Sequence, residues 1–429
     1  MLLTMPRAIH TRPHRSRKHC LLLVTVLLTW GCSSPERVAE APAPPKPLPW
    51  ELSLTPGTLA TGANSMGPQL TASPNGAVMS WMEQNDDTFT LRFAELSPAG
   101  QWTAPTTITS GKDWFVSGVD PPAVLRLRDG SLAAAWYKAV DLATEAYDTL
   151  MATSRDDGKT WSKVFSPHHD GTRSQHGFAS LFEWPAAQGS GLGMVWLDGR
   201  AGADMGLFSA RFDGTWKQTV EAPVNARVCE CCPTSVAVAA GGPVAAFRDR
   251  SAEEVRDIHV VRRDGDKWAD PVPVFAKHWQ VDSCPVNGPA IAADGNNVAV
   301  AWFEAPDDDG HAYVAFSSDA GKTFGKPVRV DDAASLGHVG VVMLEGGAAA
   351  VTWIEFDNGG RFRVRRVEPS GARSAAKQIA GGEGAYVSGI PRIARAGNQL
   401  LFAWAETRGE EPGAAQKVVT ATAVIPRLP

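Results

Sequence analysis

The sequence has little of several features that would assign it to a familiar class. Its 429 residues include only 4 Tyr and 6 Cys, and its longest apolar run covers ten residues, 21–30. Glycine and proline are plentiful, but no Gly-X-Y period is present, which excludes a collagen-like protein. No stretch has a sustained 3.6-residue apolar period, which excludes coiled coils, helical solenoids and α/β sheets.

Positive charge is also scarce in the body of the chain. The net charge is −5, yet the first 31 residues hold five basic residues and no acid. Without that segment the net charge would be −10. A surface of this sign repels phosphate backbones, so a nucleic-acid partner is excluded.

The N-terminus has the order of an export signal, with a basic segment and then the short apolar run 21–30. Gly31-Cys32 follows and resembles the bacterial lipobox. It departs from the usual pattern at one position, because Thr29 stands three residues before Cys32, where the pattern has Leu, and Leu28 stands four residues before it. The resemblance implies residues 1–31 as a signal peptide, lipidation at Cys32 and a Pro-rich linker over 32–49. We expect a protein of the bacterial cell envelope, on the periplasmic or outer-membrane face, that meets the membrane through its lipid anchor only. A secreted protein with a chance cysteine is the alternative.

The rest of the chain is built on a repeat. A short apolar strand ends in an aromatic residue and an acid follows two positions later, with Lys at the acid position in one copy. The copies are Trp81-Met-Glu83, Trp136-Tyr-Lys138, Trp196-Leu-Asp198, Phe247-Arg-Asp249, Trp302-Phe-Glu304, Trp353-Ile-Glu355 and Trp404-Ala-Glu406. Their spacing of about 51 residues gives seven periods after residue 50.

Each period has the pattern of four short strands joined by turns, clearest at 289–294, 297–305, 312–318 and 326–331. This predicts an all-β β-propeller over 50–429 made of four-stranded antiparallel blades, with seven blades favoured and six as the alternative. The last period holds only three strands, at 390–396, 399–406 and 416–424. We expect the N-terminal segment 50–56 to supply the missing strand and close the ring.

The turns between third and fourth strands carry the most specific motif. It is Ser-x-Asp-x-Gly-x-Thr-aromatic, present at Ser154, Asp156, Gly158 and Trp161 and again at Ser317, Asp319, Gly321 and Phe324. It resembles the Asp box, or BNR repeat, of the sialidase (neuraminidase) superfamily. That resemblance implies a propeller fold, with the Asp boxes on the rim away from the usual active site.

The loops of the opposite rim hold most of the polar residues that could take part in binding or catalysis. Six histidines of the body map there, namely His168, His169, His176, His278, His311 and His338, together with Trp279 and Asn287 from the loops between blades. Loops on a rigid scaffold converge on a binding site, so we expect a glycan or another small ligand on this rim. His176, Trp279 and Asn287 are candidate substrate-binding residues.

The sialidase resemblance also suggests roles for charged residues of this rim. Sialidases hold the substrate carboxylate with an arginine triad, for which Arg200, Arg248 and Arg250 are the candidates. Asp120 or Asp198 would be the acid and Tyr386 the nucleophile. The family's aromatic-Arg-Ile-Pro strand is absent from the first blade. Gly389-Ile-Pro-Arg-Ile393 holds similar letters in another order and another blade. A salt-bridge ladder between blades is the alternative role for Arg248 and Arg250.

Four cysteines form a second constellation on this rim, Cys229, Cys231, Cys232 and Cys284. In an exported protein they are most simply two disulfides, and Cys229–Cys232 with Cys231–Cys284 is one of three possible pairings. The alternatives are a reactive thiol or a soft metal, copper(I) or zinc, bound with His176 or His278. No cofactor is otherwise expected.

The segment from His168 to Gly177 is a third constellation. Its three histidines and Asp170 could ligate a metal or transfer protons, or could form a hydrogen-bonded loop. Taken together, the sequence predicts a lipid-anchored sialidase-like propeller that binds a glycan and hydrolyses it if the catalytic set is complete. The alternatives are a non-catalytic binding or assembly module of the envelope and a Cys/His metal-binding propeller. The oligomeric state is not indicated.

Overall fold

The repeat of about 51 residues corresponds to seven antiparallel sheets in the computed structural model. The described residues are 46–428 except 75, 142, 186–189, 203, 266, 357–359, 383–385 and 408–413. Cys32, the expected signal peptide and most of the linker lie outside them. Within the described residues, no helix has the length and apolar character needed to cross a membrane.

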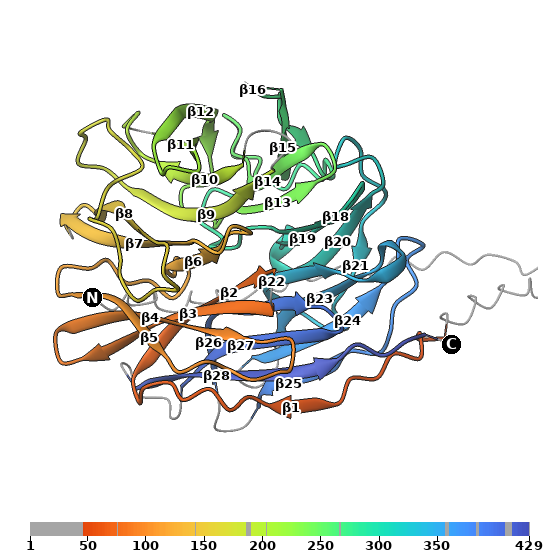
Figure 1. The fold of residues 1–429 in the computed structure, drawn as a ribbon. Coiled ribbons are helices and arrows are strands. Elements are labelled where there is room, and N and C mark those ends of the chain that lie inside the picture. The colour runs from red at the N-terminus through yellow and green to blue at the C-terminus, as the bar shows by residue number, and fades with distance from the viewer. Residues whose placement is uncertain are drawn as a thin grey trace, which may run out of the picture. The chain divides into compact units, whose positions relative to one another are not determined.

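The seven sheets are the blades of a propeller, numbered here in chain order (Figure 1). Blade 1 is β2 (Ser65–Ser73), β3 (Gly76–Asn85), β4 (Thr88–Leu96) and β5 (Thr106–Gly111). Blade 2 is β6 (Ala123–Arg126), β7 (Leu132–Asp141) and β8 (Ala146–Ser154). Blade 3 is β9 (His176–Trp184), β10 (Gly191–Asp198), β11 (Met205–Phe212) and β12 (Gln218–Val228).

The remaining blades follow the same order from the innermost strand outward. Blade 4 is β13 (Ser235–Ala239), β14 (Gly242–Arg248) and β15 (Ile258–Asp264), flanked by β16 (Lys267–Trp268) and β17 (Val272–Pro273). Blade 5 is β18 (Ala290–Asp294), β19 (Asn297–Glu304), β20 (His311–Ser317) and β21 (Val328–Arg329), with a 3-10 turn at Pro306–Asp308. Blade 6 is β22 (Ser335–Met343), β23 (Ala349–Glu355), β24 (Arg361–Val367) and β25 (Lys377–Gly381), with a 3-10 turn at Glu345–Gly347. Blade 7 is β26 (Tyr386–Ala396), β27 (Gln399–Thr407) and β28 (Gln416–Val424), completed by β1 (Leu54–Pro56).

Seven blades are therefore confirmed over the alternative of six, and the strands of blade 5 begin and end close to their predicted positions. Blade 2 departs from the pattern because it has three strands. Where a fourth strand would lie, Phe165 pairs with Met151 of β8 through two backbone hydrogen bonds of 2.8 and 3.0 Å.

The aromatic-x-acid motif has a physical reason in three of the blades. Residues i and i+2 of a strand point to the same face, so the carboxylate can accept a hydrogen bond from the indole N–H. Trp81 donates to Glu83 at 2.9 Å, Trp196 to Asp198 at 2.8 Å and Trp302 to Glu304 at 3.3 Å. The motif thus satisfies a buried polar group, and its acids are structural residues in these blades.

The apolar core lies between the blades. Seven clusters of buried side chains are present among the described residues, and each joins two neighbouring blades, including blade 7 with blade 1. Each blade is thus apolar on both faces, which explains why the middle strands read as continuous apolar runs.

The ring is closed by the two ends of the propeller, as the sequence predicted. Leu54 pairs with Ala423 and Pro56 with Ala421, so β1 covers the outer edge of β28. Ser65 of blade 1 accepts a hydrogen bond of 2.8 Å from the Val418 amide of blade 7. Trp50 and Leu52, ahead of β1, are each only 3% exposed and pack into the cluster between blades 6 and 7. The first residues of the propeller therefore stabilise its last blade.

This closure predicts a large stability effect at Trp50. Trp50→Ala should lower the free energy of unfolding by about 3–5 kcal/mol, because it empties a well-packed site. Glu51→Ala, at the exposed position between the two buried side chains, is the matched control and should leave stability unchanged. Denaturant unfolding of both variants tests this; equal stabilities would contradict the closure.

Candidate functional site: the central channel

The innermost strands of all seven blades surround a central channel of about 840 Å³. Each of these strands has a neighbour on one side only within its sheet, so its other edge faces the channel. The lining is mostly small and apolar, with a few charged side chains that include Arg126, Arg392 and Arg395. The channel is thus the natural place to look for a ligand site.

Four innermost strands bulge at the level of the repeat aromatic. The pairing register shifts after Met66 in β2, after Gly177 in β9, after Gly337 in β22 and after Ser388 in β26. Each bulge contains a residue with positive φ: Gly67 (58°), Phe178 (54°), His338 (50°) and Gly389 (66°). Bulges redirect side chains, and positive φ is costly for Phe178 and His338 because they carry a Cβ. The bulges, two of which contain a strained residue, therefore mark the part of the channel wall whose backbone departs from regular strand pairing.

Arg392 directly follows the bulge of β26 and is the unusual residue of this wall. It lines the channel and is partly exposed there, yet its buried Nε has no hydrogen-bond partner. No hydrogen bond or ion pair joins Arg392 to any other residue in the described part of the chain. Burial lowers the pKa of its guanidinium to about 10, although the charge of Asp120 opposes the shift. Arg392 is therefore a cation at neutral pH without a partner of its own.

His338 of the neighbouring blade 6 also lines the channel. Its Nδ1 is buried and unpartnered, while its backbone N–H donates to the Asn287 side chain at 2.7 Å. Burial lowers the pKa of His338 to about 4, and the positive charge of Arg392 adds to the effect. The imidazole is neutral at pH 7 and offers polar nitrogen atoms beside the unpaired cation.

Asp120 lies in the loop before β6, and this loop packs on the β26 bulge where the Ile390 amide approaches the Gly118 carbonyl at 3.3 Å. Its Oδ2 accepts hydrogen bonds from the Phe178 amide at 2.8 Å and the Tyr147 hydroxyl at 3.1 Å. Burial raises the pKa of Asp120 to about 7, against opposing hydrogen bonds from Tyr137, Phe178 and Tyr147 and the charge of Arg392. Asp120 is only 3% exposed, so it acts on the channel through its charge and not by direct contact.

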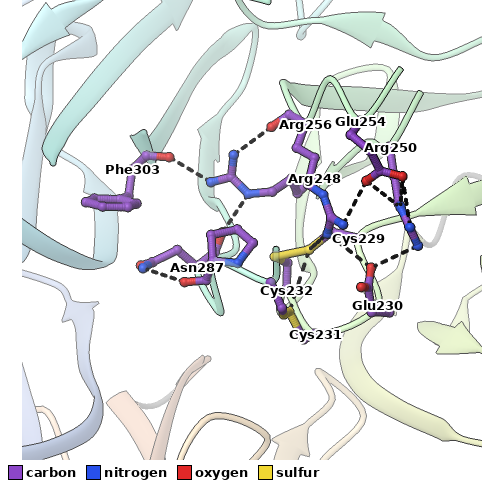
Figure 2. The surroundings of a disulfide bond; sticks show 12 residues. Cys229, Glu230, Cys231, Cys232, Arg248, Arg250, Glu254, Arg256, Asn287 and Phe303 are labelled. Carbon is purple, nitrogen blue, oxygen red and sulfur yellow. Dashed lines mark hydrogen bonds and ion pairs between the residues drawn. A yellow bond between two sulfur atoms is a disulfide. The ribbon is translucent and has the colours of Figure 1, made fainter. Parts of the chain in front are cut away.

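The predicted arginine triad is not assembled at a shared ligand site, and Arg248 shows why. Its guanidinium donates to three backbone carbonyls, those of Asn287 at 2.9 Å, Arg256 at 2.7 Å and Phe303 at 2.7 Å (Figure 2). Trp279 lies under the same guanidinium at 5.0 Å and is buried. The Asn287 amide is also occupied, because it donates to the Pro285 and Leu336 carbonyls. These three predicted binding residues join blades 4, 5 and 6.

The other two arginines are paired within their own blades. Arg250 forms hydrogen bonds of 2.9–3.0 Å with both carboxylate oxygens of Glu254 (Figure 2). Arg200 binds Asp198 through two bonds of 2.8 Å and Glu221 through one of 2.7 Å. Asp198 is fully buried in this network. Arg250 is thus ion-paired within blade 4 and not in a ladder between blades, and Asp198 holds Arg200 in place.

Two further predicted residues lie outside the channel lining. Tyr386 is the partly buried first residue of β26 and pairs with Thr407. His176 begins β9, is fully buried, and belongs to a separate His–Asp cluster between blades 2 and 3.

The cysteines pair in one of the three connectivities that the sequence allowed. Cys229 is bonded to Cys232, and Cys231 to Cys284, with Cα atoms 5.6 and 6.3 Å apart. The second bond joins the segment entering blade 4 to the segment entering blade 5. Arg256 donates to the Cys229 sulfur at 3.4 Å (Figure 2). The disulfides therefore brace the rim around Arg248.

The two Ser-x-Asp-x-Gly turns have the same hydrogen bonds. Ser154 accepts from the Gly158 amide, and Ser317 from the Gly321 amide, both at 2.9 Å. The Asp156 and Asp319 carboxylates each accept from the amide of a Thr four residues later at 2.9 Å. Trp161 and Phe324 pack against the interblade clusters. These turns follow the third strand of blades 2 and 5, and their hydrogen bonds stabilise the fold there.

Comparison with known proteins adds to the fold. No family model and no curated protein matches the chain. The solved structures it resembles include the lectin BP39L from Burkholderia pseudomallei, with a TM-score of 0.57 and 13% identity over 84% of this chain and 96% of that one. The polysaccharide lyase Uly1 has a TM-score of 0.52 and 11% identity over 86% and 92%. The GH93 α-L-arabinofuranosidase of Fusarium graminearum, solved with arabinobiose, has a TM-score of 0.50 and 16% identity over 73% and 95%. At these identities the likeness establishes the propeller fold.

Sequence reasoning missed Arg392 as a site residue. The signal was present in Gly389-Ile-Pro-Arg-Ile393, where an arginine stands between apolar residues of an innermost strand. Residue type and loop position favoured Arg200, Arg248 and Arg250 instead. The partners that occupy these three side chains are brought together by tertiary contacts, which the sequence does not reveal.

The raised pKa of Asp120 predicts a pH dependence of stability. The native state holds a proton on Asp120 up to about pH 7, whereas the unfolded chain releases it near the ordinary value of 3.8. The native state therefore binds more protons within this window, and the contribution of Asp120 to stability is lost as the pH rises through about 7. Asp120→Asn mimics the protonated form and should flatten that loss.

Denaturant unfolding of the wild type and Asp120→Asn at pH 5 and pH 8 tests this. The difference in unfolding free energy between the two pH values should be larger in the wild type. Equal differences would show that Asp120 titrates normally.

Proposed function

We propose that the protein is an exported, lipid-anchored propeller that binds an acidic glycan in its central channel, with Arg392 receiving the sugar carboxylate. The observation that carries the proposal is the unpaired guanidinium of Arg392 in the channel wall. The buried Nε of this partly exposed cation has no hydrogen-bond partner, and a bound carboxylate would supply one through a charge-assisted, bidentate hydrogen bond.

Electrostatics favour this position over the rest of the surface. The net charge is −5 for the full sequence and −10 without the first 31 residues, so long-range attraction does not draw an anion to the protein. Local recognition is required, and Arg392 supplies it with the neutral His338 beside it. The pKa of Asp120 is about 7, so its carboxyl group can hold a proton at neutral pH. The positive charge of Arg392 is then not neutralised by Asp120 and can bind the ligand anion.

The structural neighbours support a sugar ligand. Their names describe a lectin, a polysaccharide lyase and an arabinofuranosidase with arabinobiose bound. The acidic character of the ligand comes from the charge of Arg392, and the resemblance of the two turns to sialidase Asp boxes makes sialic acid the first sugar to test.

Hydrolysis is a second candidate, favoured by the pKa of Asp120 near neutrality, which suits a general acid. Binding is better supported, because Asp120 is buried and Asp198 is tied to Arg200. Release of the fluorophore from a fluorogenic sialoside would establish hydrolysis, and binding without release would assign a lectin-like role.

Arg392→Ala should weaken binding of a sialylated oligosaccharide by about 10- to 100-fold, since a hydrogen bond to a charged group contributes about 1.5–3 kcal/mol. Binding of the asialo form should change little. Isothermal titration of the wild type and the variant with both oligosaccharides measures the effect.

Arg395→Ala is the matched control. Arg395 lines the channel on the same strand, but its guanidinium donates to the Met343 and Gly397 carbonyls. This variant should bind the sialylated sugar as the wild type does. Equal affinity of the wild type for the sialylated and asialo sugars, or unchanged affinity in Arg392→Ala, would refute the proposal.

A further inference from the structure

A cluster of two histidines and two aspartates lies between blades 2 and 3, outside the channel lining. The imidazole rings of His168 and His176 stack with centroids 3.7 Å apart and planes within 5°. His176 is fully buried, and the side chain of His168 is 7% exposed. Asp148 and Asp170 lie at opposite edges of the stack.

Asp170 engages one nitrogen of each ring. Its Oδ1 lies 3.3 Å from His168 Nδ1 and 3.2 Å from His176 Nε2, and its Oδ2 is hydrogen-bonded to His176 Nε2 at 3.3 Å. Of these two nitrogens, only His176 Nε2 is hydrogen-bonded to Asp170, and Asp170 Oδ1 has no hydrogen-bond partner among the described residues. The other nitrogen of each ring, His168 Nε2 and His176 Nδ1, lies on the Asp148 side of the stack.

At that other edge, two ring nitrogens lie beside one carboxylate oxygen. Asp148 Oδ1 lies 3.6 Å from His168 Nε2 and 3.3 Å from His176 Nδ1, and both nitrogens are buried without a hydrogen-bond partner. A cation placed between them would satisfy the carboxylate and both ring nitrogens at once.

A metal ion satisfies the arrangement. Bonds of about 2.0–2.1 Å to zinc in a tetrahedral site place ligand atoms roughly 3.3 Å apart, close to the two separations observed. The ligand atoms lie within 4.8 Å of one another. Asp170 then has the role of the carboxylate that receives the second N–H of a metal-bound histidine.

The backbone fixes these ligands before any ion binds. Tyr147 and Gln175 form a bridge between the start of β8 and the segment entering β9, which sets Asp148 beside His176. The Thr149 hydroxyl donates to the His176 carbonyl. Asp148 is 32% exposed, so the site opens to solvent and a water molecule can complete the coordination.

The second carboxylate group near His176 is a poorer candidate. Asp170 and Asp198 flank His176 Nε2, but Arg200 already places its guanidinium on both, 3.5 Å from Asp170 and 2.8 Å from Asp198. A metal ion there would meet this cation.

We propose that Asp148, His168 and His176 bind a divalent first-row transition metal, for which zinc is the probe, and thereby clamp blade 2 to blade 3. The site is independent of the glycan proposal because its residues lie outside the channel lining.

Metal analysis and zinc titration of the full-length protein, purified without a histidine tag and stripped with chelator, test the proposal. The wild type should bind one zinc per chain and unfold at a higher temperature with zinc than without. His168→Ala, His176→Ala and Asp148→Asn should each bind zinc at least about 100-fold more weakly, and Asp170→Asn about 10- to 100-fold more weakly.

His169→Ala is the matched control, since His169 lies in the same loop but is exposed and paired with Glu221 at 3.1 Å. It should bind zinc as the wild type does. Circular dichroism checks that each variant is folded, and the partly exposed Asp148→Asn remains informative if a histidine variant fails to fold. Absence of zinc binding by the folded wild type, or equal binding by the folded Asp148→Asn, would overturn the proposal, as would zinc bound only after reduction of the disulfides.

Discussion

Closure of the ring is the constraint on which the rest of the structure depends. Seven sheets with apolar faces are stable only when every face meets a neighbour, and the last contact, between blades 7 and 1, joins residues from opposite ends of the propeller. Strand β1 covers the edge of β28, and Ser65 accepts a hydrogen bond from Val418 across the closing interface. Once the ring is closed, seven innermost strands must share a narrow channel, and four of them bulge where they pass the repeat aromatics. The bulges determine which side chains meet the channel.

That geometry separates charged residues that look alike in sequence. Arg200, Arg248 and Arg250 stand near strand ends, where backbone carbonyls and carboxylates are within reach, and each donates several hydrogen bonds to them. Arg392 stands behind a bulge of an innermost strand, where its neighbours are the neutral His338 and a buried aspartate with a raised pKa. The same chemical group is a structural clamp in one setting, and in the other we propose that it receives an anion. The disulfides reinforce the first setting by fixing the rim around Arg248.

The fold could be predicted from the sequence because its signals are local. Trp302-Phe-Glu304 and its equivalents recur at a regular spacing, and in three blades the indole and the carboxylate on the same strand face are hydrogen-bonded. The three strands of blade 7 and the missing fourth were likewise visible, and the N-terminal strand fills the gap. The candidate site could not be predicted in the same way. Whether an arginine is free depends on carbonyls such as that of Phe303, 55 positions from Arg248, and no local pattern reports such contacts. The sialidase resemblance of the two turns describes a folding device and leaves the chemistry as a prediction.

The central claim is that the channel receives a sugar carboxylate at Arg392. A crystal structure of the protein with N-acetylneuraminic acid bound tests it most directly. The account predicts the carboxylate within hydrogen-bonding distance of the Arg392 guanidinium, in the channel beside His338. A sugar bound on the rim at Arg200 or Arg250, with those arginines released from Asp198 and Glu254 and with Arg392 uncontacted, would contradict it.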